Sequence, residues 1–575
     1  MRQKRQSFIP VFSLILAAAS CSGPQAPSKA TISDLQANID KGPPPFVAKD
    51  PLSQNHWEST RQVYTLRQFQ SVLSSTDVVL QALQNASADG LNPEDFDVGG
   101  LQTLRDSLKS SPDSAKENEL DLHLTYSLVR YVSQLCFGRI DPRMINPEWP
   151  ETGRNCDVDQ IVFDALQKNT VENLSEQLSP AIPEYQGLKK TLQRYRDIAA
   201  QGGWQTVQGE VSKERGSRGV PDGALLAATL EGTGDLETSV GNETPSRAAV
   251  REALARFQAR HGLESKKALD AKTLAAMNVP IEQRIEQIEI NMDRMRWIAH
   301  RLEPKHVLVN VPGFQLSVHD ADQIPLQMRA IVGSMENPTP IMDDQIEYVV
   351  FSPYWNIPIS IAVKEFLPKI KRDRNYLRSQ ELEVVRTSGG KAQVVEPSKV
   401  AWDKVEDAEY QLRQKPGTKN ALGLVKFMFP NSYNVYLHDT PSGNLFDRLT
   451  RSLSHGCVRI EHPADLAAYV LQDQPEWTPE RIEEAMHAEK EQNVPLKTKL
   501  PIHVVYWTAW ADAEGNAQFR EDVYGFDQKH RELVSKTVNA SSPSANPSGV
   551  NMHKVGRRVV AHAAALDGQS RLPEK

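Results

Sequence analysis

"HVLVNVPGFQLSVHD", residues 306–320, is the stretch at which the pattern of the chain changes. Apolar side chains recur there at every second position: Val307, Val309 and Val311, then Phe314, Leu316 and Val318. Because successive side chains of a strand point to opposite faces, this period predicts β-strands. "NVYLHD" (434–439) and "IHVVYWTAW" (502–510) have the same character. The back half of the chain is therefore predicted to be rich in β-structure.

The front half has a helical period instead. "LDLHLTYSLVRYVSQL" (120–135) and "LKKTLQRYRDIAAQ" (188–201) place apolar residues at steps of three and four. A further helix is predicted at 281–298, where Ile281, Ile285, Ile288, Met292 and Met295 recur in the same way. A helical front and a β-rich back predict a multidomain α+β protein.

Linker composition suggests where the parts begin and end. We expect a helical domain at 59–218, a second small helical domain at 219–280, a connecting helix at 281–302 and a β-rich domain at 303–528. Residues 373–418 are charged and contain "TSGG" and "KPGTKN", so they are predicted to be an inserted subdomain or flap. Residues 529–575 are predicted to be a disordered tail because of their Ser/Pro/Asn composition.

Length and charge narrow the class of protein. A chain of 575 residues is too long for one core and implies several domains. Its formal net charge of -7 is small for this size and provides no basic surface for nucleic acid, so we expect no nucleic-acid partner.

The N-terminus predicts export. Basic residues at the start are followed by an apolar run from Phe8 to Ala19 and then by small residues, the order of a secretory signal peptide at 1–21. That run is shorter than the roughly 20 residues that cross a bilayer. "AAASC" also resembles a bacterial lipobox, which implies that Cys21 carries lipid and that residues 22–58 tether the protein to a membrane. Without lipidation, Cys21 is removed with the signal peptide.

Three cysteines then remain in an oxidising compartment, where two can pair. Cys136 and Cys156 are near neighbours around a turn-like segment, but their spacing leaves a disulfide open. If they pair, the odd thiol is Cys457, in "SLSHGCVRI" (452–460).

Two histidines are candidates for a base that would activate this thiol. His455 is two residues away, too close to meet the sulfur without strain, whereas His438 lies nineteen positions upstream at the end of a predicted strand. A paired histidine raises the thiolate fraction of a cysteine. Gly456 allows backbone conformations closed to other residues, so N–H groups near Cys457 could bind the oxygen of an attacked carbonyl. Together these residues predict acyl transfer through a thioester.

"HDTPSGNLFDRLTRSLSHGCVRI" (438–460) resembles the signature of the L,D-transpeptidases with a YkuD-type catalytic domain: a histidine, fifteen intervening residues (439–453), then Ser-His-Gly-Cys. "FSPYWNIPISIAVKEFLPKIKRDRNYL", "TKNALGLVKFMFPNSYNVYLHDTPSG" and "YSLVRYVSQLCFGRIDPRMINPEWP" resemble the large, YcbB-like subgroup. This resemblance covers residues 60–528.

The resemblance implies a role for each matching residue. Cys457 would be the nucleophile and His438 its base, and the backbone N–H groups of His455, Gly456 and Cys457 would form the oxyanion hole. Arg459 would position the substrate or the loop. Tyr436 and Trp355 would line the cleft, although for both aromatic residues core packing remains an alternative, as a structural salt bridge does for Arg459.

Residues 219–280 resemble a small helical peptidoglycan-binding domain. The residues on its pattern are Phe257, Gln258, His261, Gly262, Leu263, Leu269, Asp270, Thr273 and Leu274. Most of them are predicted to be core and turn residues. "SKKALD" replaces the "DG" that usually precedes the last helix of such a domain. The resemblance implies glycan strands as a partner of this domain.

The expected protein is thus a periplasmic enzyme that links peptidoglycan stem peptides. By resemblance, Cys457 attacks a tetrapeptide donor, D-Ala leaves, and a diamino-acid side chain of a second stem attacks the thioester to form a 3→3 cross-link. Neither a metal nor an organic cofactor is expected, and carbapenems should acylate Cys457. The alternatives are an L,D-carboxypeptidase acting on the same stems and a non-catalytic peptidoglycan-binding protein. A zinc site built from Cys457, His455 and His438 would lack a nearby fourth ligand.

Overall fold

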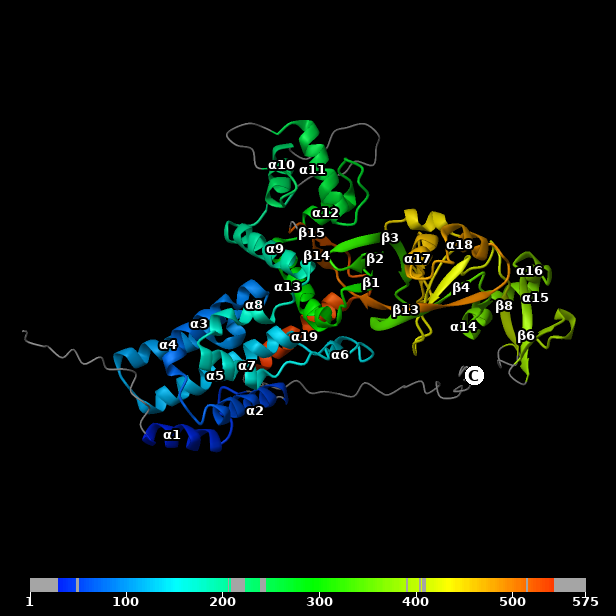
Figure 1. Ribbon diagram of the computed structural model, residues 1–575. Helices are drawn as coiled ribbons and strands as arrows, with labels where there is room; N and C mark the ends of the chain where they lie inside the picture. The colour runs from blue at the N-terminus through cyan, green and yellow to red at the C-terminus, as the bar shows by residue number, and fades with distance from the viewer. Residues whose placement is uncertain are drawn as a thin grey trace, which may run out of the picture.

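The computed structural model describes residues 29–47, 51–204, 206–207, 223–237, 245–388, 391–402, 405, 410–512 and 515–541. Figure 1 shows an N-terminal block of helices beside a β-rich body, with a small helical lobe projecting from them and a second sheet at the far end of the β-rich body. The predicted signal peptide, Cys21 and residues 542–575 lie outside the described residues. None of the helices found in the described ranges combines the length and apolar character needed to span a membrane.

The N-terminal block surrounds one long central helix. Its helices are α1 (Lys29–Asp40), α2 (Pro51–Leu66), α3 (Thr76–Asn85), α4 (Val98–Ser110), α5 (Ser114–Phe137), α6 (Pro142–Ile145), α7 (Val158–Lys168), α8 (Leu174–Leu178) and α9 (Pro183–Ala200). The Asp113 side chain caps the start of α5 by accepting from two backbone N–H groups. At its end Gly138 has φ +77°, and a Cβ there would lie 2.6 Å from the indole nitrogen of Trp297. The helical period predicted for 120–135 is confirmed in α5.

The prediction of a tether at 22–58 is wrong for the residues that the structure describes. Most of 29–58 is helical, in α1 and the first half of α2. Leu35, Ile39 and Trp57 are buried in one cluster with Leu122 and Tyr126 of α5. Burial of these apolar side chains against α5 makes the segment part of the helical domain, which begins before residue 59.

The structure contains a disulfide between Cys136 and Cys156, the pairing that their spacing had left open. The bond joins the end of α5 to the residue before Asp157, the N-cap of α7. Closing a loop of this length stabilises a fold by about 3 kcal/mol, mainly by restricting the unfolded chain.

The small lobe consists of α10 (Gly223–Gly232), α11 (Arg247–Arg260) and α12 (Ala271–Met277). It has its own apolar core, which includes Phe257. Gln258 is buried and donates to the Ala268 carbonyl, and the Asp270 carboxylate caps α12 by accepting from the Thr273 N–H. The pattern residues of this segment thus serve as core and capping residues. The ring of His261 stacks between Phe257 and Phe519, so the lobe packs against the C-terminal part of the chain.

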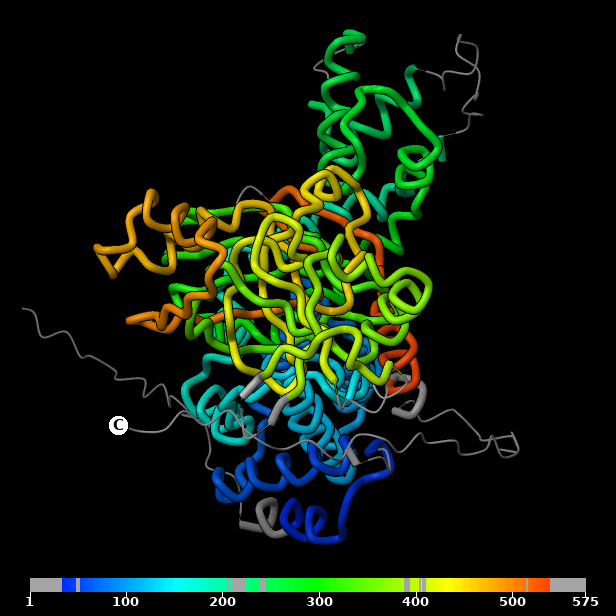
Figure 2. The backbone as a smooth tube through the Cα atoms, turned by 90° about the vertical axis from the view of Figure 1, so that its right-hand side faces the viewer, coloured from blue at the N-terminus to red at the C-terminus, as the bar shows by residue number. Residues whose placement is uncertain are grey.

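The β-rich body is a nine-stranded sheet that closes on itself. Figure 2 shows this body, in green, yellow and orange, between the blue N-terminal helices and the small helical lobe. The strand order is β11-β3-β12-β10-β9-β4-β13-β1-β2, and β2 also pairs with β3. The strands are β1 (Lys305–Asn310), β2 (Gln315–Asp320), β3 (Gln323–Gly333), β4 (Met342–Phe351), β9 (Val425–Met428), β10 (Leu437–His438), β11 (Ser452–Ser454), β12 (Val458–Ile460) and β13 (Gln492–Val505). The alternating residues Val307, Val309, Leu316 and Val318 all lie in its core. Two helices, α17 (Pro463–Val470) and α18 (Pro479–Met486), follow β12.

The inserted subdomain begins earlier than the predicted 373–418. Its sheet, β5-β8-β6-β7, starts at β5 (Trp355–Asn356) and continues through β6 (Leu382–Ser388), β7 (Lys391–Val395) and β8 (Gln411–Gln414). Four short helical segments precede β6: α14 (Ile359–Ile361), η6 (Ala362–Phe366), α15 (Leu367–Arg372) and α16 (Asn375–Ser379). Ile357, Leu367, Ile370 and Leu412 are buried in a core of its own. The predicted boundary was wrong because the apolar residues before 373 belong to this core.

Two further helices join the parts of the chain. The helix predicted at 281–298 is α13 (Ile281–Ile298), and α19 (Phe526–Ser541) follows a short hairpin of β14 (Ala509–Ala511) and β15 (Ala517–Phe519). The prediction of a disordered tail from residue 529 is therefore wrong as far as Ser541. The reason is that α19 packs against the interior: His530 is fully buried, stacks on Trp297 and contacts the Asp293 carboxylate at 3.2 Å.

Burial of His530 predicts a loss of stability in acid. Burial lowers the pKa of this histidine from 6.5 to about 4. Between those two values the unfolded chain takes up a proton that the folded chain does not, so the free energy of unfolding falls as the pH falls from about 6.5 to about 4. The full contribution is roughly 3 kcal/mol. Denaturant unfolding at pH 7 and pH 4.5 should show the decrease, and it should be smaller by about 2 kcal/mol in His530→Gln. Parallel losses in the two proteins would contradict this account.

Candidate active site

Cys457 lies in the short turn between β11 and β12 and is partly buried. Gly456 has φ +115°, a conformation that other residues rarely adopt, so the glycine is required by the backbone. Two hydroxyl groups hold this turn. Thr339 donates to the Gly456 carbonyl at 2.8 Å, and Ser454 donates to the Cys457 carbonyl at 2.5 Å. The thiol is therefore presented by a backbone with its own internal hydrogen bonds.

The same turn corrects the predicted oxyanion hole. The Gly456 N–H donates to the Ser454 hydroxyl at 3.1 Å, so it does not point at a substrate oxygen. In the described part of the chain, no residue accepts a hydrogen bond from the Cys457 N–H. Of the two groups, the Cys457 N–H is the one that is open to an incoming carbonyl oxygen.

His438 reaches the same part of the sheet from β10, which lies between β9 and β12. In the strand register His438 stands opposite Lys426 of β9 on one side and opposite Arg459 of β12 on the other. Opposed residues share a face of a sheet, and so do residues two apart along one strand. The charges of Arg459 and Lys426 act on both His438 and the Cys457 thiol, and Tyr436 hydrogen-bonds to that thiol. The five side chains therefore lie together, although Cys457 and His438 are nineteen residues apart in the chain.

The imidazole of His438 is held in one tautomer. Its Nδ1 lies 2.5 Å from the carbonyl oxygen of Asp439, which can only accept, so Nδ1 carries the proton and Nε2 is the basic nitrogen. Burial lowers the pKa of His438 to about 3, and the charge of Arg459 acts in the same direction. The ring is therefore neutral at pH 7. No described hydrogen bond joins it to the thiol, and in enzymes without substrate such bonds are often long.

The surroundings of the thiol act on its pKa in two directions. Burial raises the pKa of Cys457, whereas hydrogen bonds from Tyr436 and the charges of Arg459 and Lys426 lower it. The net direction is upward. The Sγ atom lies 3.8 Å from the carbonyl oxygen of Asn434. A side-chain hydrogen bond joins Tyr436 to the thiol.

His455 and Trp355 face the inserted subdomain. The His455 ring is half-exposed, and its Nε2 lies 2.8 Å from the carboxylate of Glu365 in η6. Trp355 packs edge-on against Phe366, at 5.8 Å between ring centres, beside the subdomain core. Trp355 is partly buried, and its assignment to the cleft stays a prediction.

Three residues around the thiol were missed from the sequence: Lys426, Ser454 and Thr339. The sequence pattern could have indicated Lys426. It lies within the apolar stretch "VKFMF" (425–429), and strand alternation places it on the opposite face of the sheet from Val425 and Phe427. No sequence pattern indicated Thr339, because it is far from Cys457 in the chain and contacts Gly456 only in the folded structure.

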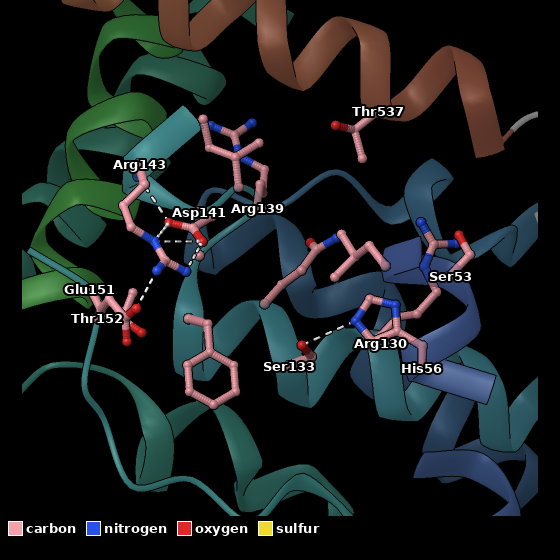
Figure 3. A pocket seen from close by; sticks show the side chains of 15 residues that line it. Ser53, His56, Arg130, Ser133, Arg139, Asp141, Arg143, Glu151, Thr152 and Thr537 are labelled. Carbon is pink, nitrogen blue, oxygen red and sulfur yellow. Dashed lines mark hydrogen bonds and ion pairs between the residues drawn. The ribbon is translucent and has the colours of Figure 1, made fainter. Parts of the chain in front are cut away.

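A cavity of about 280 Å³ lies elsewhere, between α2, the end of α5 and α19 (Figure 3). Its polar side chains pair with one another: His56 with Ser133 at 3.1 Å, and Arg143 with Asp141 at 2.7 Å. None of the residues proposed for catalysis lines it. Within the described ranges there is also no group of three or more His, Cys, Asp or Glu side chains arranged to hold a metal ion.

Solved structures similar to the chain include "L,D-transpeptidase from Mycobacterium smegmatis", at 14% identity and a TM-score of 0.17 over 35% of this chain and 58% of that one. Another is "Structure of the Ldtfm-avibactam carbamoyl enzyme", at 10% identity and a TM-score of 0.15 over 55% of this chain and 80% of that one. At these TM-scores neither likeness bears on the argument.

The sequence comparisons are more specific. A Haemophilus influenzae protein named "Putative L,D-transpeptidase" is 34% identical over 245 residues, which are 42% of this chain and 48% of that protein. The chain thus matches about half the length of this curated relative. Residues 58–192 match a family described as a scaffold domain, and residues 304–494 match YkuD, described as the L,D-transpeptidase catalytic domain. Cys457, His438 and their neighbours all lie within the second match, so the candidate site belongs to the part of the chain that is similar to the YkuD L,D-transpeptidase catalytic domain.

Proposed function

We propose that the protein is a peptidoglycan L,D-transpeptidase that forms 3→3 cross-links between stem peptides. The observation that carries the proposal is the gathering of a thiol with a neutral imidazole and two cationic side chains of β9, β10 and β12, within the segment that matches YkuD. A thiol beside a basic nitrogen is the arrangement used for acyl transfer.

The reaction proceeds in two halves. His438 Nε2 takes the thiol proton while the Cys457 sulfur attacks the carbonyl carbon of the third residue of a tetrapeptide donor. The C–N bond to the terminal D-Ala breaks, and His438 returns the proton to the leaving amine. The side-chain amine of a diamino acid on a second stem then attacks the thioester, the C–S bond breaks, and its proton passes to the thiolate. The Cys457 N–H binds the oxyanion in both halves.

Other parts of the chain take supporting roles in this proposal. The lobe formed by α10–α12 binds glycan strands, Arg459 positions the donor, and the inserted subdomain covers it. The enzyme works in the periplasm; cleavage before Cys21 leaves this cysteine as the first residue, and lipid on it tethers the enzyme to the membrane. Carbapenems acylate Cys457 because their strained carbonyl resembles the donor amide. No metal ion or organic cofactor takes part in these steps.

Mass spectrometry of the purified protein with disaccharide-tetrapeptide tests the proposal. The expected result is a dimer lighter by one D-Ala, together with a transient adduct that digestion locates on Cys457. A tripeptide product with the same adduct would keep the nucleophile but make the protein an L,D-carboxypeptidase. Neither product nor adduct would leave a peptidoglycan-binding protein without catalysis.

A further inference from the structure

Before it takes the thiol proton, the neutral His438 supplies no positive charge to the thiol. A cysteine thiolate is usually stabilised by an adjacent imidazolium, a helix N-terminus or a basic side chain. Here the imidazole is neutral at pH 7, because its pKa is about 3. The turn at 455–457 joins two strands, so no helix begins there. The remaining sources are the basic side chains on the same face of the sheet.

Lys426 is one of these side chains, and its charge is not neutralised within the site. It is partly buried on β9, opposite His438, and its Nζ lies 5.6 Å from the centre of the Tyr436 ring, whose hydroxyl group contacts the thiol. In the described part of the chain no carboxylate lies within 4 Å of Nζ. A lysine placed in this way loses part of its hydration and gains no ion pair in exchange, so its field acts on the groups beside it.

Arg459 lies on the other side of His438, and its buried Nε also has no hydrogen-bond partner among the described residues. The two cations therefore flank His438. Among the described residues Arg459 forms no ion pair within 4 Å, whereas the buried Arg294 pairs with Asp527 at 2.5 Å. A site with two unpaired cations is arranged to receive negative charge.

We propose that Lys426 is a positioning residue that provides, from β9, the positive charge that stabilises the Cys457 thiolate. The inference rests on the proposed role of Cys457 as the nucleophile. The charged and titratable groups that face the thiol or Lys426 are Tyr436, His438, Arg459 and Glu491, with His455 and Glu365 beyond the turn. Lys426 and Arg459 are the basic side chains nearest the thiol in this set. Burial lowers the pKa of Lys426, whereas the charges of Glu491 and Cys457 raise it, and burial also lowers the pKa of Arg459.

The test is the rate at which iodoacetamide alkylates Cys457 as a function of pH, with the adduct located by digestion. In Lys426→Met the midpoint of the pH profile should move up by about one unit, which makes alkylation at pH 7 about tenfold slower. Lys426→Arg keeps the charge and should stay within about twofold of the wild type. Lys419→Met is the matched control, since Lys419 is exposed and pairs with Glu381 at 3.4 Å; its profile should not move.

An unchanged midpoint in Lys426→Met would overturn the inference, and so would equal shifts in the Met and Arg variants, because charge would then not be the cause. Lys426→Gln serves if the methionine variant does not fold. The readout is independent of the proposed function: alkylation that responds to Lys426 in a protein that makes no cross-linked dimer would refute transpeptidation and leave this inference standing. In an active enzyme, loss of the charge should lower kcat about tenfold and change KM little.

Discussion

Replacing Cys457 by alanine is expected to lower the rate of stem-peptide cross-linking by at least about 10³-fold, the scale of losing a covalent nucleophile. Without the sulfur no thioester can form, and the remaining groups can only bind the donor and polarise its carbonyl. The thiol is partly buried, and its contacts are a long one to the Asn434 carbonyl, at 3.8 Å, and a hydrogen bond with Tyr436. Folding stability should therefore change by less than about 1 kcal/mol.

The measurement is the initial rate of dimer formation by chromatography, with thermal unfolding of the same samples. Thr498→Ala is a suitable control in the same domain, because this exposed threonine bonds only to Asp473, at 2.9 Å. It should retain full activity. Cross-linking by Cys457→Ala at more than a tenth of the wild-type rate would refute the proposed mechanism.

Replacing Asp293 by alanine is expected to destabilise the protein by about 3 to 5 kcal/mol, the cost of leaving buried charges uncompensated. Asp293 is fully buried on α13 and contacts Arg139 at 2.5 Å, Arg296 at 2.9 Å and His530 at 3.2 Å. Burial by itself would raise the pKa of Asp293, but Arg139, His530 and Arg296 hold it well below its usual range. The carboxylate therefore stays charged in the interior, and its removal leaves two arginines without their partner.

Denaturant unfolding at pH 7 measures this effect. Glu58→Ala is the control, because the Glu58–Arg61 pair is exposed, with both side chains more than two-fifths accessible, and such pairs contribute less than about 1 kcal/mol. If both variants lost the same free energy of unfolding, the buried network would stabilise the protein no more than an exposed ion pair does. A larger loss in Asp293→Ala is the expected result, since Asp293 joins α13 to Arg139 after α5 and to His530 of α19.

Much of the candidate site followed from local patterns. The spacing of His438 and Cys457 and the Gly456 between two polar neighbours identified the chemistry, and the register of β10 against β12 agrees with it. The helix at 281–298 and the strand from 306 onward also followed from periodicity. These features could be predicted because each depends only on which face of a single helix or strand is apolar.

Other features depended on long-range contacts and were predicted wrongly or not at all. The segment predicted to be a tether folds into α1 and α2 because Trp57 is buried against Tyr126 of α5. The segment predicted to be a disordered tail forms α19 because His530 is buried against Asp293. The Gly456 N–H donates a hydrogen bond to the Ser454 hydroxyl. Lys426 lies in the site because β9 pairs with β10, and this pairing could not be predicted from the positions of Lys426 and Cys457 in the sequence.

The sequence by itself thus predicted the secondary-structure classes and the proposed nucleophile–base pair of this protein, since hydrophobic period and motif spacing are properties of short segments. Only the tertiary structure decided which N–H remains open at Cys457, which cations face the thiol and how the helical block is joined to the sheet. Those outcomes depend on charges and hydrogen-bond partners that lie up to hundreds of residues apart, and in a buried site each polar group must find its partner in space.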